Sequence, residues 1–127
     1  MFYADQTLLE VAGQLMIATL FLGTLAINAT TKVQQHVDRM AAMGIPLPRA
    51  ILWAGFALQG VGGAMVALDW RADVGAVLLI VFTVLASAIF HRFWAVEDPL
   101  RRHLHLSFMF SNIAVIGGLL LLVRRPS

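Results

Sequence analysis

Few side chains in this sequence could do chemistry, and most of them are uncharged. Thr83, Ser87 and His91 recur every four residues, which places them in a polar line on one face of an expected helix. Gln59 and Asn112 lie within two other strongly apolar stretches. Polar groups inside a membrane are costly unless they are satisfied, so each marks a candidate site. We therefore predict that these five residues line a polar pocket for an amphiphilic molecule such as a quinone or a lipid.

The same side chains have a second explanation, which is that they hold the helices of one bundle together. Interhelical hydrogen bonds in lipid contribute roughly 1–2 kcal/mol or less each, enough to account for their presence. On this explanation the bonding residues are Gln14, Gln59, Ser111 and Asn112. Small residues permit the close approach that such bonds need. We expect helix packing at Gly55, Gly60, Gly63, Ala64, Ser111, Gly117 and Gly118.

The four histidines lack the spacing of a metal or haem site. Haem in a helical bundle needs two facing imidazoles, and a metal ion needs three or four converging ligands. His103 and His105 are two residues apart and would point to different faces of a helix, and no His-x-x-x-His or Glu-x-x-His spacing occurs. We predict no metal ion and no covalent cofactor, and a hydrogen bond from His91 to a backbone carbonyl or a carboxylate.

Known catalytic motifs are also missing from the sequence. It contains no Gly-rich phosphate loop, no Gly-x-Ser-x-Gly elbow and no paired carboxylates within an apolar stretch. We therefore expect no catalytic residues and no enzymatic activity of the chain on its own.

The elements that must position these residues are membrane-spanning helices. Of the 127 residues, 60% are hydrophobic and 13% charged, and the mean hydropathy is +0.83. Soluble chains carry roughly 45–50% apolar and about 25% charged residues, so soluble enzyme folds are excluded. A bilayer-spanning helix needs about 20 residues, and four of them leave room only for short connections. The lack of cysteine excludes disulfides, thiol redox chemistry and iron–sulfur clusters.

We predict an all-α fold, an antiparallel up-down four-helix bundle in the membrane, with a short interfacial helix between the first and second spans. Residues 1–127 form a single domain, with spans at about 7–28, 49–68, 74–91 and 104–123 and the interfacial segment at about 30–43. That segment is the longest polar stretch, yet Val33, Val37 and Met40 recur at spacings of three and four, which is typical of an amphipathic helix.

Charge predicts how the chain sits in the membrane. Four spans place both termini on one side, and basic residues are more numerous on the other, with Lys32, Arg39, Arg49, Arg92, Arg101 and Arg102 against Arg71, Arg124 and Arg125. The positive-inside rule therefore favours termini outside the cytoplasm. No Lys or Arg precedes the first apolar run, so we expect no cleaved signal peptide.

Localisation and general partners follow from the same composition. We expect a multi-pass protein of a bacterial inner membrane. The formal net charge is only +2 and lies at the membrane surfaces, so we expect contacts with membrane lipids and none with nucleic acid.

Several stretches, taken in order, carry a resemblance to a known family. They are Met43 to Pro48 before the second span, Gly60 to Gly63 within it, Arg71 in the following turn, Phe90 to Trp94, and Asn112 to Leu121 in the last span. In that order and spacing the chain resembles the DoxX family of small four-helix membrane proteins. The resemblance implies an integral membrane protein, and some relatives are linked to quinone-coupled sulfur oxidation or to membrane oxidoreductase assemblies.

The chain departs from the family pattern at charged positions. Where the family often has Glu in the second helix and Lys before the asparagine of the fourth, this chain has Gln59 and Ser111. A hydrogen bond between the two remains possible, but a charge that could act on a proton or substrate is gone. The basic residue of the first helix is also missing, and the family's Gly-x-x-Lys matches Lys32 only with a shifted spacing.

We therefore predict an accessory or structural subunit of a larger membrane complex, with other integral membrane subunits as partners. An electron-transfer or oxidoreductase assembly is the type that the resemblance favours. The alternative is a quinone-interacting oxidoreductase subunit with its polar pocket near His91 and Asn112. A small-molecule transporter is less favoured, because no charged residue marks a pathway through the spans.

Overall fold

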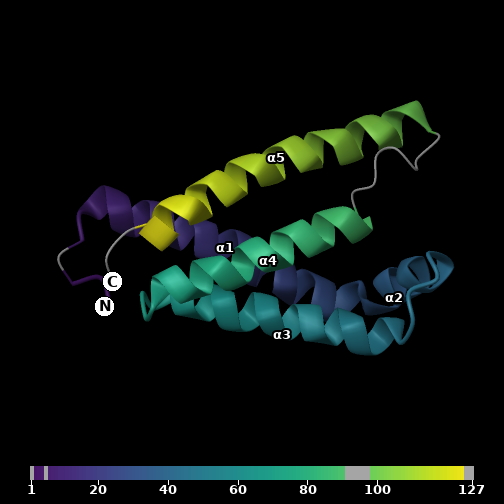
Figure 1. Ribbon diagram of the computed structural model, residues 1–127, viewed down its shortest axis with the longest axis horizontal. Coiled ribbons are helices and arrows are strands. Elements are labelled where there is room, and N and C mark those ends of the chain that lie inside the picture. Colours follow the sequence, from purple (N-terminus) through teal and green to yellow (C-terminus); the bar gives the residue numbers. More distant parts are fainter. Residues whose placement is uncertain (1, 5, 91–97, 125–127) are drawn as a thin grey trace.

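The predicted membrane bundle is what the chain forms. A computed structural model of the protein describes residues 2–4, 6–90 and 98–124 (Figure 1). These residues form α1 (Leu8–Thr31), α2 (Val33–Ala42), α3 (Pro48–Ala67), α4 (Ala72–Phe90) and α5 (Pro99–Arg124), and they contain no strand. Four helices, all except α2, are long and apolar enough to cross a membrane. The predicted all-α fold is confirmed.

The last helix, α5, is longer than the span predicted for it. The sequence predicts a span from about 104, whereas α5 begins at Pro99. Asp98 explains the early start, because its side chain accepts a hydrogen bond from Leu100 N at 3.1 Å and its carbonyl accepts one from Arg102 N at 2.8 Å. An Asp cap followed by proline in the first turn is a strong helix start. Hydropathy marks the part of a helix that spans lipid, not the whole helix.

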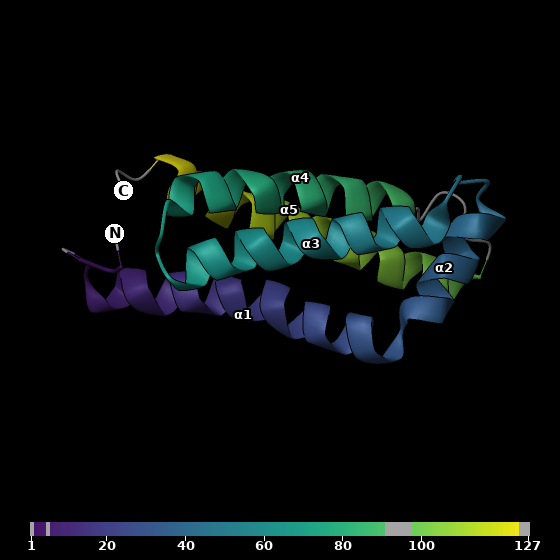
Figure 2. The same ribbon diagram turned by 90° about the horizontal axis from the view of Figure 1, so that it is seen from below.

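Caps also set the start of α1, where sequence and structure agree. Thr7 and Glu10 form a capping box, in which Glu10 N donates to Thr7 Oγ1 at 3.1 Å and Thr7 N donates to Glu10 Oε1 at 3.2 Å. At the other end α1 continues to Thr31, past the predicted boundary at about 28, and α2 follows at once. Figure 2 shows α2 lying across the end of the bundle, beside the start of α3.

Two glycines bring α3 and α4 together near their short connecting turn. A Cβ added to Gly75 would lie 2.8 Å from Met65 Cβ and 3.0 Å from the carbonyl oxygen of Gly62. A Cβ on Gly62 would in turn lie 3.1 Å from the carbonyl oxygen of Gly75. Small residues let helix backbones approach this closely, which is how helices associate in lipid. The sequence did not indicate these two glycines.

On its other side α3 packs against α1 through Gly60 and Gly63, two of the residues predicted to form helix contacts. A Cβ on Gly63 would lie 2.8 Å from Leu22 Cδ2, and one on Gly60 would lie 3.2 Å from Leu25 Cδ2. The core between α1, α3, α4 and α5 is apolar, and its fully enclosed members include Val66, Leu79 and Leu119. The helix α3 is therefore the central element, with α1 on one face and α4 on another.

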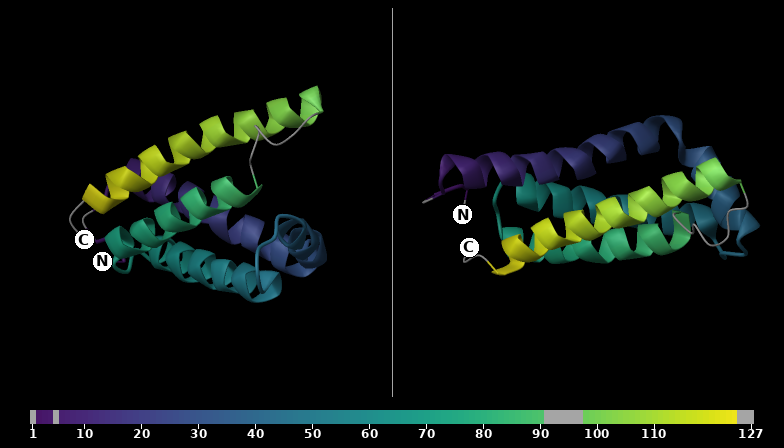
Figure 3. Two further views of the ribbon diagram at one scale, coloured as in Figure 1. Left: turned by 45° about the vertical axis from the view of Figure 1, so that its right-hand side comes forward. Right: turned by 90° about the horizontal axis from the view of Figure 1, so that it is seen from above.

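The last helix, α5, is the least enclosed of the four spans. It packs along α4 but meets α1 only near its C-terminal end, where a Cβ on Gly118 would lie 3.5 Å from Ile17. Figures 1 and 3 show α5 leaning away from α1 and α3 toward its Pro99 end. The start of α1 and the end of α5 lie at the opposite, closed end of the bundle.

Substitution of Gly75 tests the α3–α4 contact. We expect Gly75→Ala to destabilise the bundle by about 1–3 kcal/mol, because the new methyl group overlaps a backbone carbonyl that cannot rotate away. Gly117→Ala is the matched control, since no described heavy atom lies within 4 Å of its added Cβ. It should be neutral or stabilising, because alanine favours helix by roughly 0.5–1 kcal/mol. Unfolding in mixed detergent micelles, followed by circular dichroism, measures both, and equal effects would contradict the contact.

Candidate functional site

A cavity of about 620 Å³ lies between the diverging part of α5 and the other helices. All five helices contribute to its wall. Its polar lining consists of Thr24, Asn28, His36, Arg39, Gln59, Thr83 and Asn112, and its aromatic lining of Phe21, Phe56, Phe82 and Phe108. The cavity extends from the middle of the spans toward the α2 end, where α5 stands furthest from α1 (Figure 3). It combines apolar walls with a few polar groups, the usual character of a small-molecule site.

Gln59 is the most buried polar side chain of this lining, with 2% of its surface exposed. Its Nε2 donates to the carbonyl oxygen of Phe21 at 2.7 Å and to Thr24 Oγ1 at 2.9 Å. Because a carbonyl oxygen can only accept, these bonds fix which end of the amide is the nitrogen. Gln59 Oε1 is then buried and accepts no hydrogen bond from the described residues. Such an acceptor costs roughly 1–3 kcal/mol unless a donor reaches it.

Asn112 and Thr83 line the cavity from α5 and α4. Asn112 Nδ2 donates to Ser87 Oγ at 2.8 Å, which joins the two helices and leaves the second amide proton of Asn112 available. Thr83 is 4% exposed, and its hydroxyl donates to the carbonyl oxygen of Leu79 at 2.8 Å, so its lone pairs remain available as acceptors. Both residues therefore stabilise the fold and present a polar group to the cavity.

Most of the residues predicted to form a pocket thus come together. Gln59, Thr83 and Asn112 line the cavity, and Ser87 is bonded to Asn112. His91, the remaining member of the predicted set, lies outside the described residues, as does Glu97. Gln59, Thr83 and Asn112 converge because their helices turn these positions toward the bundle interior, away from lipid.

The hydrogen bond between Gln59 and Ser111 that the sequence left possible is not formed in the described structure. Gln59 bonds to α1, and Ser111 is exposed, while its neighbour Asn112 turns inward. One residue along a helix is a rotation of about 100°, so only one of the two can face the cavity. Among the residues expected to pack, a Cβ added to Gly55 would lie 3.8 Å from the Phe82 ring. Ala64 and Gly117 lie on exposed faces, and no described heavy atom lies within 4 Å of a Cβ added to Gly117.

Four polar lining residues were not predicted as part of the site: Thr24, Asn28, His36 and Arg39. Thr24 and Asn28 are four residues apart, a spacing that places them on one face of α1 and could have revealed them. No comparable signal existed for α2. Its polar residues all suit a helix at the membrane surface, and only the packing against α1 and α3 decides which of them turn inward.

His36 and Arg39 make the α2 end of the cavity basic. Burial lowers the pKa of His36 below its ordinary value of 6.5, and the positive charges of Arg39 and Lys32 lower it further. His36 is therefore neutral at pH 7, and the charge at this end of the cavity belongs to Arg39. A neutral imidazole can donate and accept a hydrogen bond.

A separate polar cluster closes the opposite end of the bundle. Asp69 is 1% exposed, and its carboxylate accepts hydrogen bonds from Gln14 Nε2 at 2.9 Å and from Tyr3 N at 2.8 Å. Gln14 Nε2 also donates to the carbonyl oxygen of Val66 at 2.8 Å, and the Tyr3 hydroxyl donates to that of Ala67 at 2.8 Å. Asp69 has a left-handed backbone, with φ +51°, which Asp tolerates better than most residues. The sequence suggested only a turn here.

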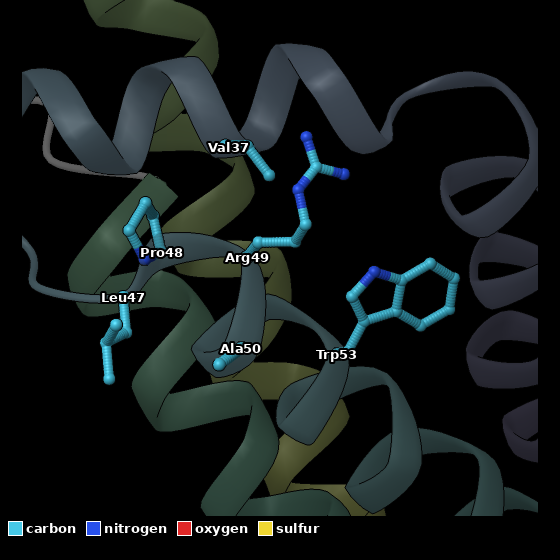
Figure 4. A pocket seen from close by; sticks show the side chains of 6 residues that line it. All are labelled: Val37, Leu47, Pro48, Arg49, Ala50 and Trp53. Carbon is cyan, nitrogen blue, oxygen red and sulfur yellow. The ribbon is translucent and has the colours of Figure 1, made fainter.

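An open depression lies outside α2 and the first turns of α3, lined by Val37, Leu47, Pro48, Arg49, Ala50 and Trp53 (Figure 4). Figure 4 shows the Arg49 side chain reaching toward α2, and its Nη2 donates to Gln34 Oε1 at 2.8 Å. Trp53 packs edge-on against Phe56 with ring centroids 5.1 Å apart. Arg and Trp at a helix end are typical of a membrane–water interface, so the depression requires no ligand.

The histidine and carboxylate side chains do not form a metal site in the described ranges. No group of three or more metal-ligating side chains converges among residues 2–4, 6–90 and 98–124.

These features define a small multi-pass helical membrane protein with a largely apolar cavity that carries a few polar groups, in contact with lipid along its spans. The DoxX family model matches residues 10–92, and the chain belongs to the DoxX family. It is also similar to the Surfeit locus protein 4 homolog of Schizosaccharomyces pombe, with 28% identity over 124 residues. That match covers 93% of this chain and 34% of the relative, so the chain spans about a third of the relative's length. No solved structure matches the chain.

Truncation of Gln14 tests the cluster at the closed end. We expect Gln14→Ala to lower the free energy of unfolding by about 1–3 kcal/mol, because the buried Asp69 carboxylate loses a donor that no water can easily replace. Gln35→Ala is the control, since Gln35 is exposed on α2 and should change stability by less than about 0.5 kcal/mol. Denaturation in micelles compares the two variants, and a neutral Gln14→Ala would contradict the role of this bond.

Proposed function

We propose that this protein binds an amphiphile of the quinone class in the cavity, as a subunit of a membrane oxidoreductase assembly. The observation that carries the proposal is Gln59, a residue of the cavity wall whose Oε1 is buried and accepts no hydrogen bond from the described residues. The family resemblance adds quinone-linked chemistry as an expectation. The chain itself contributes binding and orientation of the head group.

Two polar groups suit the two redox forms of such a head group. The hydroxyl of a quinol can donate to Gln59 Oε1, which has lone pairs available. The carbonyl of a quinone can accept the second amide proton of Asn112, the first being bonded to Ser87. Because Ser87 and Thr24 hold the two amides, the head group would meet side chains that are already oriented, which lowers the entropic cost of binding.

The apolar walls suit the rest of a quinone. Phe21, Phe82 and Phe108 line the cavity from three different helices, and aromatic rings pack favourably against a flat head group. The volume of about 620 Å³ falls within the roughly 300–1,000 Å³ of small-molecule sites. Since α5 touches α1 only near its C-terminal end, an isoprenoid tail can leave the cavity between these helices into lipid.

Binding of a short-chain quinol and its quinone tests the proposal directly. We expect Gln59→Leu to weaken quinol binding, and Asn112→Leu to weaken quinone binding, each about fivefold to tenfold for the loss of one buried hydrogen bond. Thr19→Val is the control, because the Thr19 hydroxyl is exposed and bonds only to Leu15 of its own helix at 2.8 Å. Calorimetric titration of the purified protein in detergent measures the affinities. Unsaturable binding to wild type, or equal affinity in all variants that keep their thermal unfolding temperature, would reject the proposal.

A second candidate function is that of an accessory subunit packed against other integral membrane subunits. A stripe on the exposed face of α1 favours it, formed by Ala12, Thr19, Gly23, Ala26 and Thr30. No described heavy atom lies within 4 Å of a Cβ built on Gly23. Small residues at helical spacing let another helix approach closely in lipid, so this face suits a partner span better than acyl chains do.

Purification from native membranes tests this candidate. We expect wild type to co-purify with at least one integral membrane protein and Gly23→Leu to lose most of it, because a leucine would hold the partner helix away. Gly117→Leu, at another exposed glycine, should retain the partner. Mass spectrometry identifies the co-purified chains. A monodisperse wild-type particle of the mass of the chain alone, with no partner, would exclude the candidate.

The membrane we propose is a bacterial inner membrane, with the α2 end toward the cytoplasm. Basic residues support this orientation, because Lys32, Arg39, Arg49, Arg101 and Arg102 lie at that end, whereas Arg71 and Arg124 lie at the other. The positive-inside rule relates such an excess to the cytoplasmic side.

A further inference from the structure

The α2 end of the cavity carries a positive charge that the described residues do not neutralise. Arg39 is half-buried and lines the cavity, and its guanidinium makes no hydrogen bond or ion pair with them. Asn28 lines the same end from α1, and its amide likewise makes no hydrogen bond to a described residue. A half-buried arginine without a counter-charge is costly, so this arrangement favours an anion that is supplied from outside the chain.

The surroundings strengthen the positive potential. The charged side chains of the described part at this end are Lys32, Arg39, Arg49, Arg101 and Arg102 against Asp38 and Asp98. Asp38 is exposed and accepts a hydrogen bond from Gln34 Nε2 at 2.7 Å, on the side of α2 away from the cavity. The lowered pKa of His36, caused first by burial and then by Arg39 and Lys32, is the expected response of a neighbouring group to this field.

The position of the charge identifies the kind of anion. Because α2 is amphipathic and crosses the end of the bundle, Arg39 lies near the level where phospholipid phosphates reside. Apolar side chains, including Met40, Ile51 and Ile89, line the same end of the cavity and suit an acyl chain. We propose that this end of the cavity binds an anionic phospholipid, with Arg39 and Asn28 on its phosphate group and one acyl chain against the apolar wall. The phosphate contacts at Arg39 and Asn28 lie in the same cavity as the quinone contacts proposed at Gln59 and Asn112 but use other residues.

Lipid selectivity of the purified full chain tests the proposal. Phosphatidylglycerol and phosphatidylcholine are titrated in the same detergent, and native mass spectrometry counts the retained lipids. We expect wild type to prefer phosphatidylglycerol about fivefold, the factor for one basic side chain at the membrane surface. Arg39→Gln should abolish the preference. Arg49→Gln is the matched control, since Arg49 lies at the same end but outside this cavity, bonded to Gln34, and it should keep the preference.

Several results would overturn the proposal. One is a wild type without preference, and another is an equal loss in Arg39→Gln and Arg49→Gln, which would indicate diffuse attraction to the basic end. A third is that millimolar inorganic phosphate removes the preference and, without added lipid, raises the unfolding temperature of wild type but not of Arg39→Gln. The ligand would then be a free anion rather than a lipid.

A second variant keeps the test decisive if Arg39→Gln does not fold. Asn28→Leu leaves the charge in place and should lower phosphatidylglycerol affinity about twofold to fivefold, and an unchanged affinity would overturn the proposal. The variant Gln59→Leu separates the two sites. It should keep the lipid preference while its quinol binding is weakened, so failure of either proposal is recognisable without the other.

Discussion

Close contact between α3 and α4 is the constraint on which the rest of this bundle depends. The hydrophobic effect does not drive helices together in lipid, because acyl chains are as apolar as the side chains. The helices therefore associate through close packing and hydrogen bonds. Gly62 and Gly75 allow the two backbones to meet beside their short turn, and α1 then packs on α3 through Gly60 and Gly63. With three helices fixed in this way, Gln59 lies opposite the carbonyl of Phe21, and its amide is oriented by α1 rather than by a ligand.

The fourth span has no comparable contact, and this asymmetry creates the cavity. α5 is held to α4 by the bond between Asn112 and Ser87, and it meets α1 only near its C-terminal end. The bundle is therefore closed at the end where Gln14 and Tyr3 donate hydrogen bonds to Asp69, and open at the end where α2 lies. Gln14 Oε1 at the closed end and Gln59 Oε1 in the cavity wall are both buried without a donor from the described residues, and Arg39 at the open end has no counter-charge among them.

Much of the fold and part of the site could be predicted from the sequence, for reasons that differ by residue. Apolar runs of bilayer length predict the four spans directly, and Thr7 with Glu10 marks the first helix start. Gln59 and Asn112 stand out because polar residues are rare in such runs. Arg39 does not stand out, because a basic residue in an amphipathic helix suits the membrane surface equally well. Gly62 and Gly75 were missed since their importance lies in their mutual distance, which no spacing along the chain reveals.

The sequence by itself determined that the chain is a membrane-embedded bundle of four spans with a short amphipathic helix, and that a few uncharged polar residues lie among apolar ones. Hydropathy and periodicity are local properties, so these conclusions need no knowledge of neighbours. Only the tertiary structure decided which polar residues meet: Gln59 with α1 rather than with Ser111, and Asp69 with Gln14 rather than with water. The physical reason is that helix rotation and tilt are set by packing between helices, and a rotation of one residue exchanges lipid for the cavity.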